Sequence, residues 1–409
     1  MRCRFCATLL EDVFLDLGTA PPSNAFLSAE QLQSPETWFP LKLFTCPACR
    51  LVQVDEVQGH EQLFAPDYAY FSSYSRSWLQ HAERYVETAT TRLGLDERSL
   101  VVEIASNDGY LLQYVAQRGI PCIGIEPTAG TARVAQAKGI ETLESFFGLQ
   151  FARELVASRG PADLIVANNV LAHVPDINDF VAGLSALLKP QGVVTVEFPH
   201  LLELVGNHQF DTVYHEHFSY LSFHTVQRIF AAHGLRTWDV ETLPTHGGSL
   251  RVWASRESAA RAETPAVAAM RAREQAAGMF ELAYYQGFQS VAEAVKDAFL
   301  GFLLQQKREG KRVAGYGAAA KGNTLLNFAG VRADLLAFVA DASPHKQGRF
   351  LPGARIPVVD EAYLRAARPD FVVVLPWNLR DEITGQLSYI RDWGGQFVFA
   401  VPELEIAAA

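Results

Sequence analysis

Apolar runs alternate with amphipathic stretches between residues 99 and 197. Four of the runs have the length and the β-branched character of buried strands, and they cover residues 100–104, 121–125, 164–167 and 193–198. The stretches between them are long enough for helices. Strands that alternate with helices in this way predict an α/β fold with a doubly wound sheet of parallel strands.

A second block of the same kind follows nearer the C-terminus. Its strand-like runs predict a second, smaller Rossmann-like unit, and they cover residues 312–315, 336–340, 371–375 and 396–401. Between the two blocks, residues 256–310 are rich in Ala, Glu and Arg and predict a helical connector. Residues 68–95 predict a helix, with Tyr68, Tyr70 and Phe71 at its start.

Composition narrows the possible classes of protein. The chain has 409 residues, of which 49% are hydrophobic and 20% charged, which is globular and allows two or three domains. No apolar run approaches the roughly 18 residues of a membrane span, and the first residues lack the apolar stretch of a secretory signal. We therefore expect a cytoplasmic protein without membrane association. The net charge of −10 argues against a nucleic-acid binder, because such binding draws on neutralised phosphates.

Four of the five cysteines form two pairs, with two residues between the members of each pair. Cys3 and Cys6 make one pair, and Cys46 and Cys49 make the other. Four thiolates suit the tetrahedral coordination of zinc, and a site with all four positions filled by protein is structural rather than catalytic. Two disulfides or a redox dithiol are the alternatives, which a cytoplasmic setting and the lack of a thioredoxin pattern disfavour.

The first predicted strand runs into a polar turn that contains Gly109, at the strand end where such sheets bind ligands. Glu126 ends the second strand, 17 residues after Gly109, where an acid can bind both hydroxyls of a ribose. The turn lacks the G-x-G-x-x-G pattern of a dinucleotide site, and Glu103 at its start suits the ammonium group of S-adenosylmethionine. An ordinary strand–turn–helix with chance acids is the alternative. The expected cofactor contacts are Glu103, Ala105, Asn107, Gly109, Glu126 and Asn168.

Histidines concentrate in one part of the chain, where eight of the eleven lie between His173 and His246, a window of 74 residues. The densest piece, residues 211–220, follows the end of the fourth strand, where a substrate should lie. His, Glu and Tyr side chains together offer general acids and bases whose pKa values can be tuned near neutrality. Ordinary structural histidines are one alternative. The other is a metal site formed by His208, His215 and His217.

A second glycine-containing turn joins the strand at 312–315 to a helix. Small residues from Gly317 onward let the backbone approach a phosphate, and a helix N-terminus favours an anion. Lys321 adds a positive charge. Asp341 ends the next strand, 24 residues after Gly317, where a ribose is usually contacted. Two nucleotide-type sites in one chain suggest one for a cofactor and one for a nucleotide-carried substrate.

Together these motifs resemble the sugar C-methyltransferases of deoxysugar biosynthesis, which use S-adenosylmethionine to methylate a carbon next to the ketone of a nucleotide-linked sugar. The resemblance covers nearly the whole chain, and its most specific part is residues 214–220, Tyr-His-Glu-His-Phe-Ser-Tyr. It implies a zinc-binding module at 1–66, a class I methyltransferase domain at 67–255, a helical connector at 256–310 and a Rossmann-like sugar-nucleotide domain at 311–409. Thymidine diphosphate is the family's usual carrier.

The same resemblance implies how the chemistry is divided among the side chains. A base removes the proton next to the ketone, and the resulting enolate takes the methyl group. His217 is the implied base, and Glu216 holds the sugar or orients the imidazole. Tyr214 and His173 are the implied donors to the enolate oxygen. The residues expected to contact the sugar nucleotide are Tyr68, Tyr70, His215, Gly317, Lys321, Asn323 and Asp341.

Three other functions stay open on the sequence. The first is an O- or N-methyltransferase that acts on a nucleotide sugar or another small molecule. The second is an NAD-dependent oxidoreductase that uses the second glycine turn. The third is a non-catalytic, zinc-containing binding protein with degenerate nucleotide folds.

Overall fold

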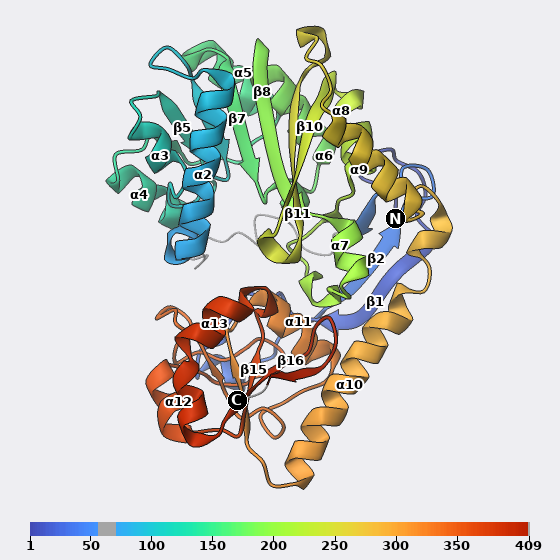
Figure 1. Ribbon diagram of the computed structural model, residues 1–409, viewed down its shortest axis with the longest axis vertical. Helices are drawn as coiled ribbons and strands as arrows, with labels where there is room; N and C mark the ends of the chain where they lie inside the picture. The colour runs from blue at the N-terminus through green and yellow to red at the C-terminus, as the bar shows by residue number, and fades with distance from the viewer. Residues whose placement is uncertain (56–70, 408–409) are drawn as a thin grey trace.

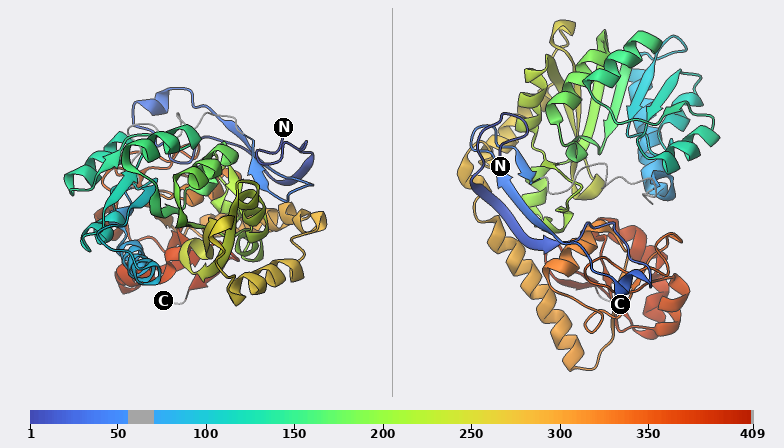
Figure 2. Two further views of the ribbon diagram at one scale, coloured as in Figure 1. Left: turned by 90° about the horizontal axis from the view of Figure 1, so that it is seen from above. Right: turned by 180° about the vertical axis from the view of Figure 1, so that it is seen from behind.

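The structure is a computed structural model, and it describes residues 1–55 and 71–407. Two α/β domains lie one above the other in Figure 1, and the N-terminal strands and the long helix α10 (Phe288–Arg308) run along one side of the junction between them. Figure 2 shows the same arrangement from above and from behind. Within the described ranges, no helix is long and apolar enough to cross a membrane.

The N-terminal module is a small antiparallel sheet. Its strands β1 (Asp12–Ala20), β2 (Phe39–Thr45) and β3 (Val52–Val54) are neighbours in that order, and β9 (Ser219–Tyr220) adds a fourth strand. β9 belongs to the histidine-rich segment, and Val52 pairs with Tyr220. The module is therefore hydrogen-bonded to the segment that carries the expected base.

The first α/β domain has a seven-stranded sheet in the order β10-β11-β8-β7-β4-β5-β6. The strands from β4 to β8 are parallel, as the alternation predicts, and β4 has β5 on one side and β7 on the other. The carboxyl end of β4 thus lies at a topological switch point, where such sheets bind ligands. The strands are β4 (Val101–Ile104), β5 (Cys122–Ile125), β6 (Thr142–Leu143), β7 (Ala162–Asn168), β8 (Leu188–Pro199), β10 (Leu235–Leu243) and β11 (Ser249–Arg256).

The sequence patterns predict no strands at residues 235–256, and there the structure differs. β10 and β11 form an antiparallel hairpin, and β11 also pairs with β8. Charged side chains interrupt the apolar pattern of this hairpin. Two of them, Arg251 on β11 and Glu241 on β10, form an ion pair with 3.2 Å between Arg251 Nη1 and Glu241 Oε2. Ser249 pairs with Pro199, so the turn of the hairpin lies beside the carboxyl end of β8.

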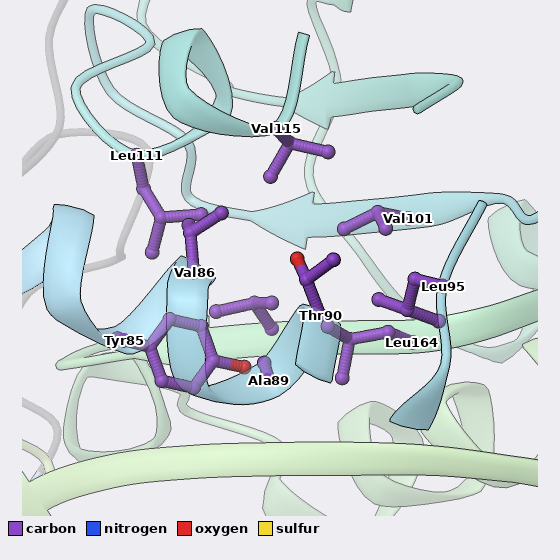
Figure 3. A pocket seen from close by; sticks show the side chains of 10 residues that line it. Tyr85, Val86, Ala89, Thr90, Leu95, Val101, Leu111, Val115 and Leu164 are labelled. Carbon is purple, nitrogen blue, oxygen red and sulfur yellow. The ribbon is translucent and has the colours of Figure 1, made fainter. Parts of the chain in front are cut away.

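Helices flank the first sheet, and α2 (Arg76–Leu93) covers one face of it. The helix begins later than residue 68, where the sequence predicts its start, because the Ser75 side chain caps it by accepting a hydrogen bond from Trp78 N. Figure 3 shows a small pocket under α2 with an almost wholly apolar lining, which is core packing and not a ligand site. The remaining helices of this domain are α3 (Leu112–Ala116), α4 (Ala129–Ala137), α5 (Leu149–Arg159), α6 (Ile177–Leu187), α7 (Leu201–Gly206) and α8 (Phe223–Ala232).

The second α/β domain has a six-stranded sheet in the order β14-β13-β12-β15-β16-β17. All neighbouring pairs are parallel except β16 and β17. β12 has β13 and β15 at its sides, so its carboxyl end is a second switch point. The elements are β12 (Val313–Tyr316), α11 (Ala320–Phe328), β13 (Val339–Ala340), β14 (Val358–Val359), α12 (Glu361–Ala367), β15 (Phe371–Val374), α13 (Arg380–Gln386), β16 (Gln396–Phe399) and β17 (Glu405–Ala407).

The region at 256–310 is shared between the two domains. α9 (Pro265–Ala276) sends Val267 and Met270 into the core that contains one face of the first sheet. In α10, Phe299 and Leu303 join the core that contains the N-terminal strands and one face of the second sheet. The zinc-type cysteines Cys3, Cys46 and Cys49 belong to the first of these cores. The N-terminal module therefore packs against both domains.

Short 3-10 helices connect the main elements. Four of them matter for the site: η3 (Leu171–His173), η4 (Phe210–Thr212), η5 (Thr245–Gly247) and η8 (Trp377–Leu379). The others are η1 (Gln31–Gln33), η2 (Ser72–Tyr74), η6 (Glu257–Ala259), η7 (Leu282–Tyr285) and η9 (Ser388–Trp393).

Candidate active site

The four paired cysteines converge at one point of the N-terminal module. Their sulfur atoms all lie within 4.8 Å of one another, and the pairs Cys3–Cys49 and Cys6–Cys46 are both 3.5 Å apart. These separations are too long for a disulfide, whose sulfurs are about 2.05 Å apart. A zinc ion with four sulfurs at ~2.3 Å would hold them about 3.8 Å apart. The residues fit a structural zinc site.

The loop after β4 is held by the acid at the end of β5. The Glu126 carboxylate accepts hydrogen bonds from the backbone N–H groups of Asn107, at 2.9 Å, and Thr128, at 2.9 Å. Ala105 and Asn107 have left-handed φ values of 56° and 51°, so the loop is tightly wound and needs this support. The Asn107 side chain accepts a hydrogen bond from Ser72 N. Glu126 thus shapes the loop in addition to its expected role toward a ribose.

Buried polar atoms without partners gather at the same edge of the sheet. Both amide atoms of Asn168 at the end of β7 and Ser106 Oγ in the loop after β4 are buried and form no hydrogen bond with a described residue. The Glu103 carboxyl on β4 is also buried, and Tyr110 is its hydrogen-bond partner. Burial raises the pKa of Glu103 well above its usual range. Buried polar groups normally find partners, so this set fits a polar, cationic ligand such as the methionine end of S-adenosylmethionine.

Gly109 closes the same loop. Its φ is 75°, and a Cβ there would come within 2.5 Å of Ile140 Cδ1. Glycine is therefore required both by the backbone conformation and by the close approach of a neighbouring side chain. The cofactor residues expected from the sequence lie on the two adjoining strand ends of β4 and β5 and at the end of β7.

His217 is held by the backbone of its own segment. Its Nδ1 lies 3.0 Å from the carbonyl oxygen of Thr212. Because a carbonyl only accepts, Nδ1 carries the proton and Nε2 carries the lone pair. Burial, followed by the nearby charge of His173, lowers the pKa of His217 well below its usual value. The ring is a neutral imidazole with an accepting nitrogen.

Two expected site residues pack around this imidazole. The rings of Tyr214 and His217 have centroids 4.0 Å apart, and those of His173 and His217 are 4.6 Å apart. His173 Nδ1 lies 2.7 Å from the carbonyl oxygen of Glu216, which again puts the proton on Nδ1. Burial lowers the pKa of His173 to about 4. In this tautomer, Nε2 of His173 is an acceptor and does not suit the expected donation to an enolate oxygen.

Glu216 and His215 turn toward the N-terminal module. Both Glu216 oxygens accept hydrogen bonds from Asn24 Nδ2, at 3.0 and 2.8 Å, and burial raises the pKa of Glu216 to about 7. His215 Nε2 lies 3.1 Å from the carbonyl oxygen of Pro40. Thr212, and not Glu216, therefore orients the His217 ring, and His215 anchors the segment to the module.

The histidines do not form a metal site. His208, His215 and His217 face three different backbone carbonyls, those of Pro402, Pro40 and Thr212. Across the described ranges, the only close group of three or more possible metal ligands is the set of four cysteines. The alternative of a second metal centre is wrong for these residues.

The loop after β12 repeats the construction of the first loop. Asp341, at the end of β13, accepts hydrogen bonds from Ala318 N at 2.7 Å and Ser343 N at 2.8 Å. Gly317 has a φ of 85°, and a Cβ there would lie 2.4 Å from Pro376 Cδ. Lys346 Nζ donates to the Ala318 carbonyl at 2.9 Å. The polar groups of this loop are thus mutually satisfied.

Lys321 and its helix face the junction between the domains. Lys321 Nζ donates to Asn378 Oδ1 at 2.7 Å and lies 4.4 Å from the centroid of the Trp377 ring. Trp377 Nε1 donates to Asp211 Oδ2 at 2.7 Å, and Asp211 lies in the histidine-rich segment. Burial lowers the pKa of Lys321 to about 8, and the charge of Asp211 partly offsets this. The second domain thus brings a cation to the expected catalytic segment.

α11 is also tied to that segment and to the N-terminal module. Thr324 Oγ1 donates to the Val213 carbonyl at 2.8 Å. The expected substrate residue Asn323 is buried, and its amide donates to the Ser23 carbonyl at 3.4 Å. Two other expected substrate residues, Tyr68 and Tyr70, lie outside the described residues.

Four residues that sequence reasoning did not assign to the site belong to it by contact: Asn24, Asp211, His246 and Trp377. Asn24 and Trp377 are far in sequence from their partners, and no local pattern marks them. His246 lies in the histidine-rich window and precedes two glycines, which is a turn signal. That signal could have placed a histidine at the strand end.

Comparison with known proteins gives a consistent result over the full length. The chain is 36% identical to the C-methyltransferase NovU of Streptomyces niveus over 410 residues, which cover 100% of this chain and 97% of that protein. Three family models match consecutive parts of the chain. They describe a zinc binding domain at residues 3–64, a methyltransferase domain at 78–240 and a C-methyltransferase C-terminal domain at 244–402.

Two further similarities cover only part of the chain. A ubiquinone biosynthesis O-methyltransferase of Leptothrix cholodnii is 31% identical over 97 residues, which cover 23% of this chain and 41% of that protein. The solved structure of magnesium protoporphyrin IX methyltransferase from Synechocystis PCC 6803 with bound SAM is 14% identical, with a TM-score of 0.36, over 50% of this chain and 100% of that chain.

Proposed function

The chain belongs to the sugar C-methyltransferase family that uses S-adenosylmethionine, and from that membership we propose that it methylates a carbon adjacent to the ketone of a nucleotide-linked deoxysugar. Thymidine diphosphate is the proposed carrier. Such a carbon is not nucleophilic until its proton is removed. The protein must therefore supply a base, a donor to the enolate oxygen and alignment of the two ligands.

The tautomer of His217 is the observation that carries this proposal. Its Nδ1–H is used on the Thr212 carbonyl, so Nε2 is available to accept a proton from the sugar carbon. The electron pair of the broken C–H bond becomes the C=C bond of the enolate, and the carbonyl pair moves to the oxygen. S-adenosylmethionine, when bound, supplies the electrophilic methyl group and leaves as the neutral thioether.

Glu216 is the competing base, because its pKa is raised to about 7. Its position argues against that role. The side chain is buried, and both oxygens already accept hydrogen bonds from Asn24. The His217 ring is partly exposed, and its hydrogen bond with the Thr212 carbonyl uses Nδ1, so Nε2 forms no hydrogen bond with a residue of the described ranges. We therefore assign the proton transfer to His217, and to Glu216 the role of tying the catalytic segment to Asn24 of the N-terminal module.

The acceptor's nucleotide is assigned to the loop after β12. That loop lies at a switch point, and its glycine and helix N-terminus suit a diphosphate. α11 continues from this loop to Lys321 and to the contact between Thr324 and Val213. A sugar attached to that diphosphate is thereby brought toward the segment of His217.

Deuterium exchange tests the base directly. The enzyme is incubated in D₂O, without a methyl donor, with a panel of nucleotide-linked keto-sugars, and exchange next to the ketone is followed by mass spectrometry. Wild-type enzyme should exchange, and His217→Asn should lower the rate by about 10²-fold or more while both ligands still bind. His224→Asn is the matched control, since that ring packs on Phe280 at 4.3 Å, away from the site. Exchange at the wild-type rate in His217→Asn would reassign the base to Glu216.

Addition of S-adenosylmethionine to the same panel tests the reaction class. A gain of one methyl group on carbon, only with sugars that carry an adjacent ketone, is expected. Turnover of a sugar without that ketone would replace the enolate mechanism with an O- or N-methyltransferase reaction.

A further inference from the structure

The turn between β10 and β11 brings a further histidine to the strand ends. This turn is η5, and it contains His246. Because Ser249 pairs with Pro199, the turn lies beside the carboxyl end of β8, the same edge of the sheet from which the segment of His217 begins.

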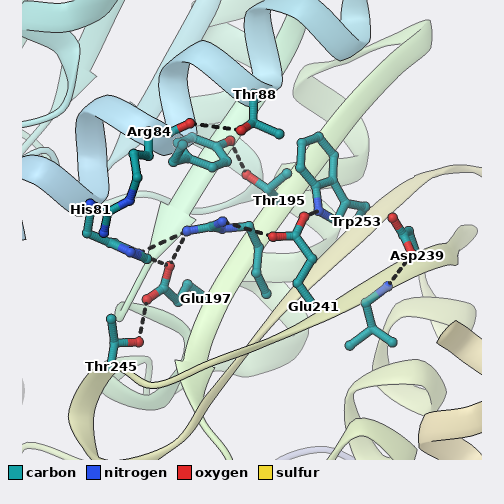
Figure 4. A network of polar contacts seen from close by, with 12 residues as sticks. His81, Arg84, Thr88, Thr195, Glu197, Asp239, Glu241, Thr245 and Trp253 are labelled. Carbon is teal, nitrogen blue, oxygen red and sulfur yellow. Dashed lines mark hydrogen bonds and ion pairs between the residues drawn. The ribbon is translucent and has the colours of Figure 1, made fainter.

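A buried polar network fixes the turn. Thr245 Oγ1 donates to Glu197 Oε1 at 3.0 Å, and the other carboxylate oxygen of Glu197 is 2.8 Å from His81 Nε2 and 2.8 Å from Arg251 Nη2. Figure 4 shows these contacts converging on Glu197. Burial alone would raise the pKa of Glu197, but the hydrogen bond with His81 and the charge of Arg251 outweigh it and lower that pKa. Glu197 is a carboxylate that holds the turn through its hydrogen bond with Thr245.

The second domain also packs against the turn. Gly247 has a φ of 86°, and a Cβ there would lie 2.5 Å from Trp377 Cη2. His246 itself has a left-handed φ of 55°, which is uncommon for a residue with a side chain and persists where the surroundings over-determine it. The turn therefore presents His246 in one orientation.

The contacts of the ring decide its tautomer. His246 Nε2 lies 3.3 Å from the amide nitrogen of Asn169. An amide N–H₂ only donates, so Nε2 accepts and Nδ1 carries the proton. The contact of Nε2 with Asn169 is the ring's hydrogen bond within the described ranges, so Nδ1 is left for another partner, and the centroids of the His246 and Trp78 rings are 5.3 Å apart. Burial, followed by the charge of Lys321, lowers the pKa of His246 to about 4, so the ring is neutral at pH 7.

We propose that His246 is a further catalytic residue, whose Nδ1–H donates a hydrogen bond to the ketone oxygen of the sugar as that oxygen becomes an enolate. This inference rests on the proposed function. The rings of His217 and His173 use their Nδ1–H groups on backbone carbonyls, so they present acceptors. His246 is the neutral imidazole that presents a donor, and a neutral imidazole is a competent electrophile for a carbonyl.

The proton balance of the step follows from the two tautomers. The proton on carbon goes to Nε2 of His217, and the carbonyl electron pair goes to the oxygen. His246 keeps its own proton and stabilises the new charge through the hydrogen bond. The cation of Lys321, from the second domain, adds to the same stabilisation, since its charge is felt by both histidines.

Two amide substitutions of His246 distinguish a role as hydrogen-bond donor from a role in packing. In His246→Asn the side-chain amide falls near the position of Nδ1, and Asn tolerates the left-handed backbone. In His246→Gln the amide reaches the position of Nε2 instead. We expect His246→Gln to lower the rate of deuterium exchange next to the ketone by about 10²–10³-fold, as for the loss of an oxyanion donor, and His246→Asn to retain at least ten times more rate than His246→Gln.

His208→Gln serves as the control. It alters a histidine of matching backbone conformation, with a φ of 54°, and should exchange at the wild-type rate. Affinity for S-adenosylmethionine, measured by calorimetry, should be the same in all variants. Wild-type exchange in His246→Gln, or equal loss in both His246 variants, would overturn the role of His246 while the proposed function stands. Failure of the wild type to exchange with any keto-sugar would overturn the proposed function and this inference together.

Discussion

The loop after β4 and the loop after β12 have the same construction, but the polar groups around them differ in whether they have hydrogen-bond partners. Each follows a parallel strand at a switch point, and each is held by the acid that ends the next strand. Glu126 accepts from Asn107 N at 2.9 Å, and Asp341 accepts from Ala318 N at 2.7 Å. Around the first loop, the buried amide of Asn168 forms no hydrogen bond with a residue of the described ranges. Around the second loop, Ala318 N and Ser343 N donate to the acid, and Lys346 Nζ lies 3.5 Å from it.

This difference in hydrogen-bond partners indicates which groups a ligand must contact at each loop. An acid at the end of the second strand supports the loop in both domains, so its presence alone does not identify a ribose site. The first loop has a preformed set of unsatisfied polar atoms, which suits a small cationic cofactor. The second loop has satisfied polar groups, and its cation, Lys321, lies at the junction with the other domain. A ligand there must meet a surface completed by both domains.

Loss of zinc should have the largest effect, because it should impair ligand binding at both loops and not at one of them. The cysteines share a core with the first sheet, while the strands of the same module share a core with the second sheet. Structural zinc contributes about 10–16 kcal/mol to folding in zinc-finger peptides. Chelated protein, or Cys46→Ser, should therefore lose binding of both ligands and show a lower melting temperature. Elemental analysis should find about one zinc per chain, and metal-free protein with both affinities intact would contradict the assignment.

Glu103→Gln should affect only the first loop. Loss of a charged partner should weaken S-adenosylmethionine binding by about 10–100-fold, since a hydrogen bond to a charged group contributes about 1.5–3 kcal/mol. Titration calorimetry with both ligands measures this, and affinity for the nucleotide sugar should not change.

The pH dependence of Glu103 gives a second readout. Burial raises its pKa in the folded protein, so the folded state holds the proton more tightly than the unfolded state. Stability is then greatest below the unfolded pKa and falls as pH rises through the folded pKa. Glu103→Gln should remove this fall and melt at a higher temperature than wild type at pH 8. The wild-type affinity for S-adenosylmethionine should rise with pH, and that of the variant should not. Parallel pH profiles would refute the assigned charge.

The smallest expected effects come from the paired acids, Glu126→Gln and Asp341→Asn. Each amide keeps one accepting oxygen and loses the other, at a cost of about 1–2 kcal/mol of unfolding free energy. Each should weaken its own ligand a few-fold, the cofactor for Glu126→Gln and the nucleotide sugar for Asp341→Asn. Calorimetry with both ligands on both variants tests this, and a crossed pattern would mean that the two loops have exchanged roles.

The pH profile of turnover adds a constraint on the base. The sequence alone predicts a rise in activity through an ordinary histidine pKa near 6–7. Because burial lowers the pKa of His217, the rise should lie below pH 6.5 instead.

Short-range sequence patterns predict much of the architecture. The strand runs before Glu126 and Asp341 and the spacing of the cysteine pairs are short-range signals, because a buried strand needs a run of apolar residues and a zinc knuckle needs two nearby thiols. The hairpin of β10 and β11 carries no such local signal, because its charged residues Arg251 and Glu241 are paired only across two strands.

Tertiary structure decided what the site residues do. Asn24 binds Glu216 from 192 residues away, and Trp377 binds Asp211 from 166 residues away. The tautomers of His217 and His246 depend on a carbonyl and an amide brought to them by the fold. A side chain's type and position in the sequence set which chemistry is available, but proton position and pKa depend on burial and on partners, and these exist only after the separate cores have packed together.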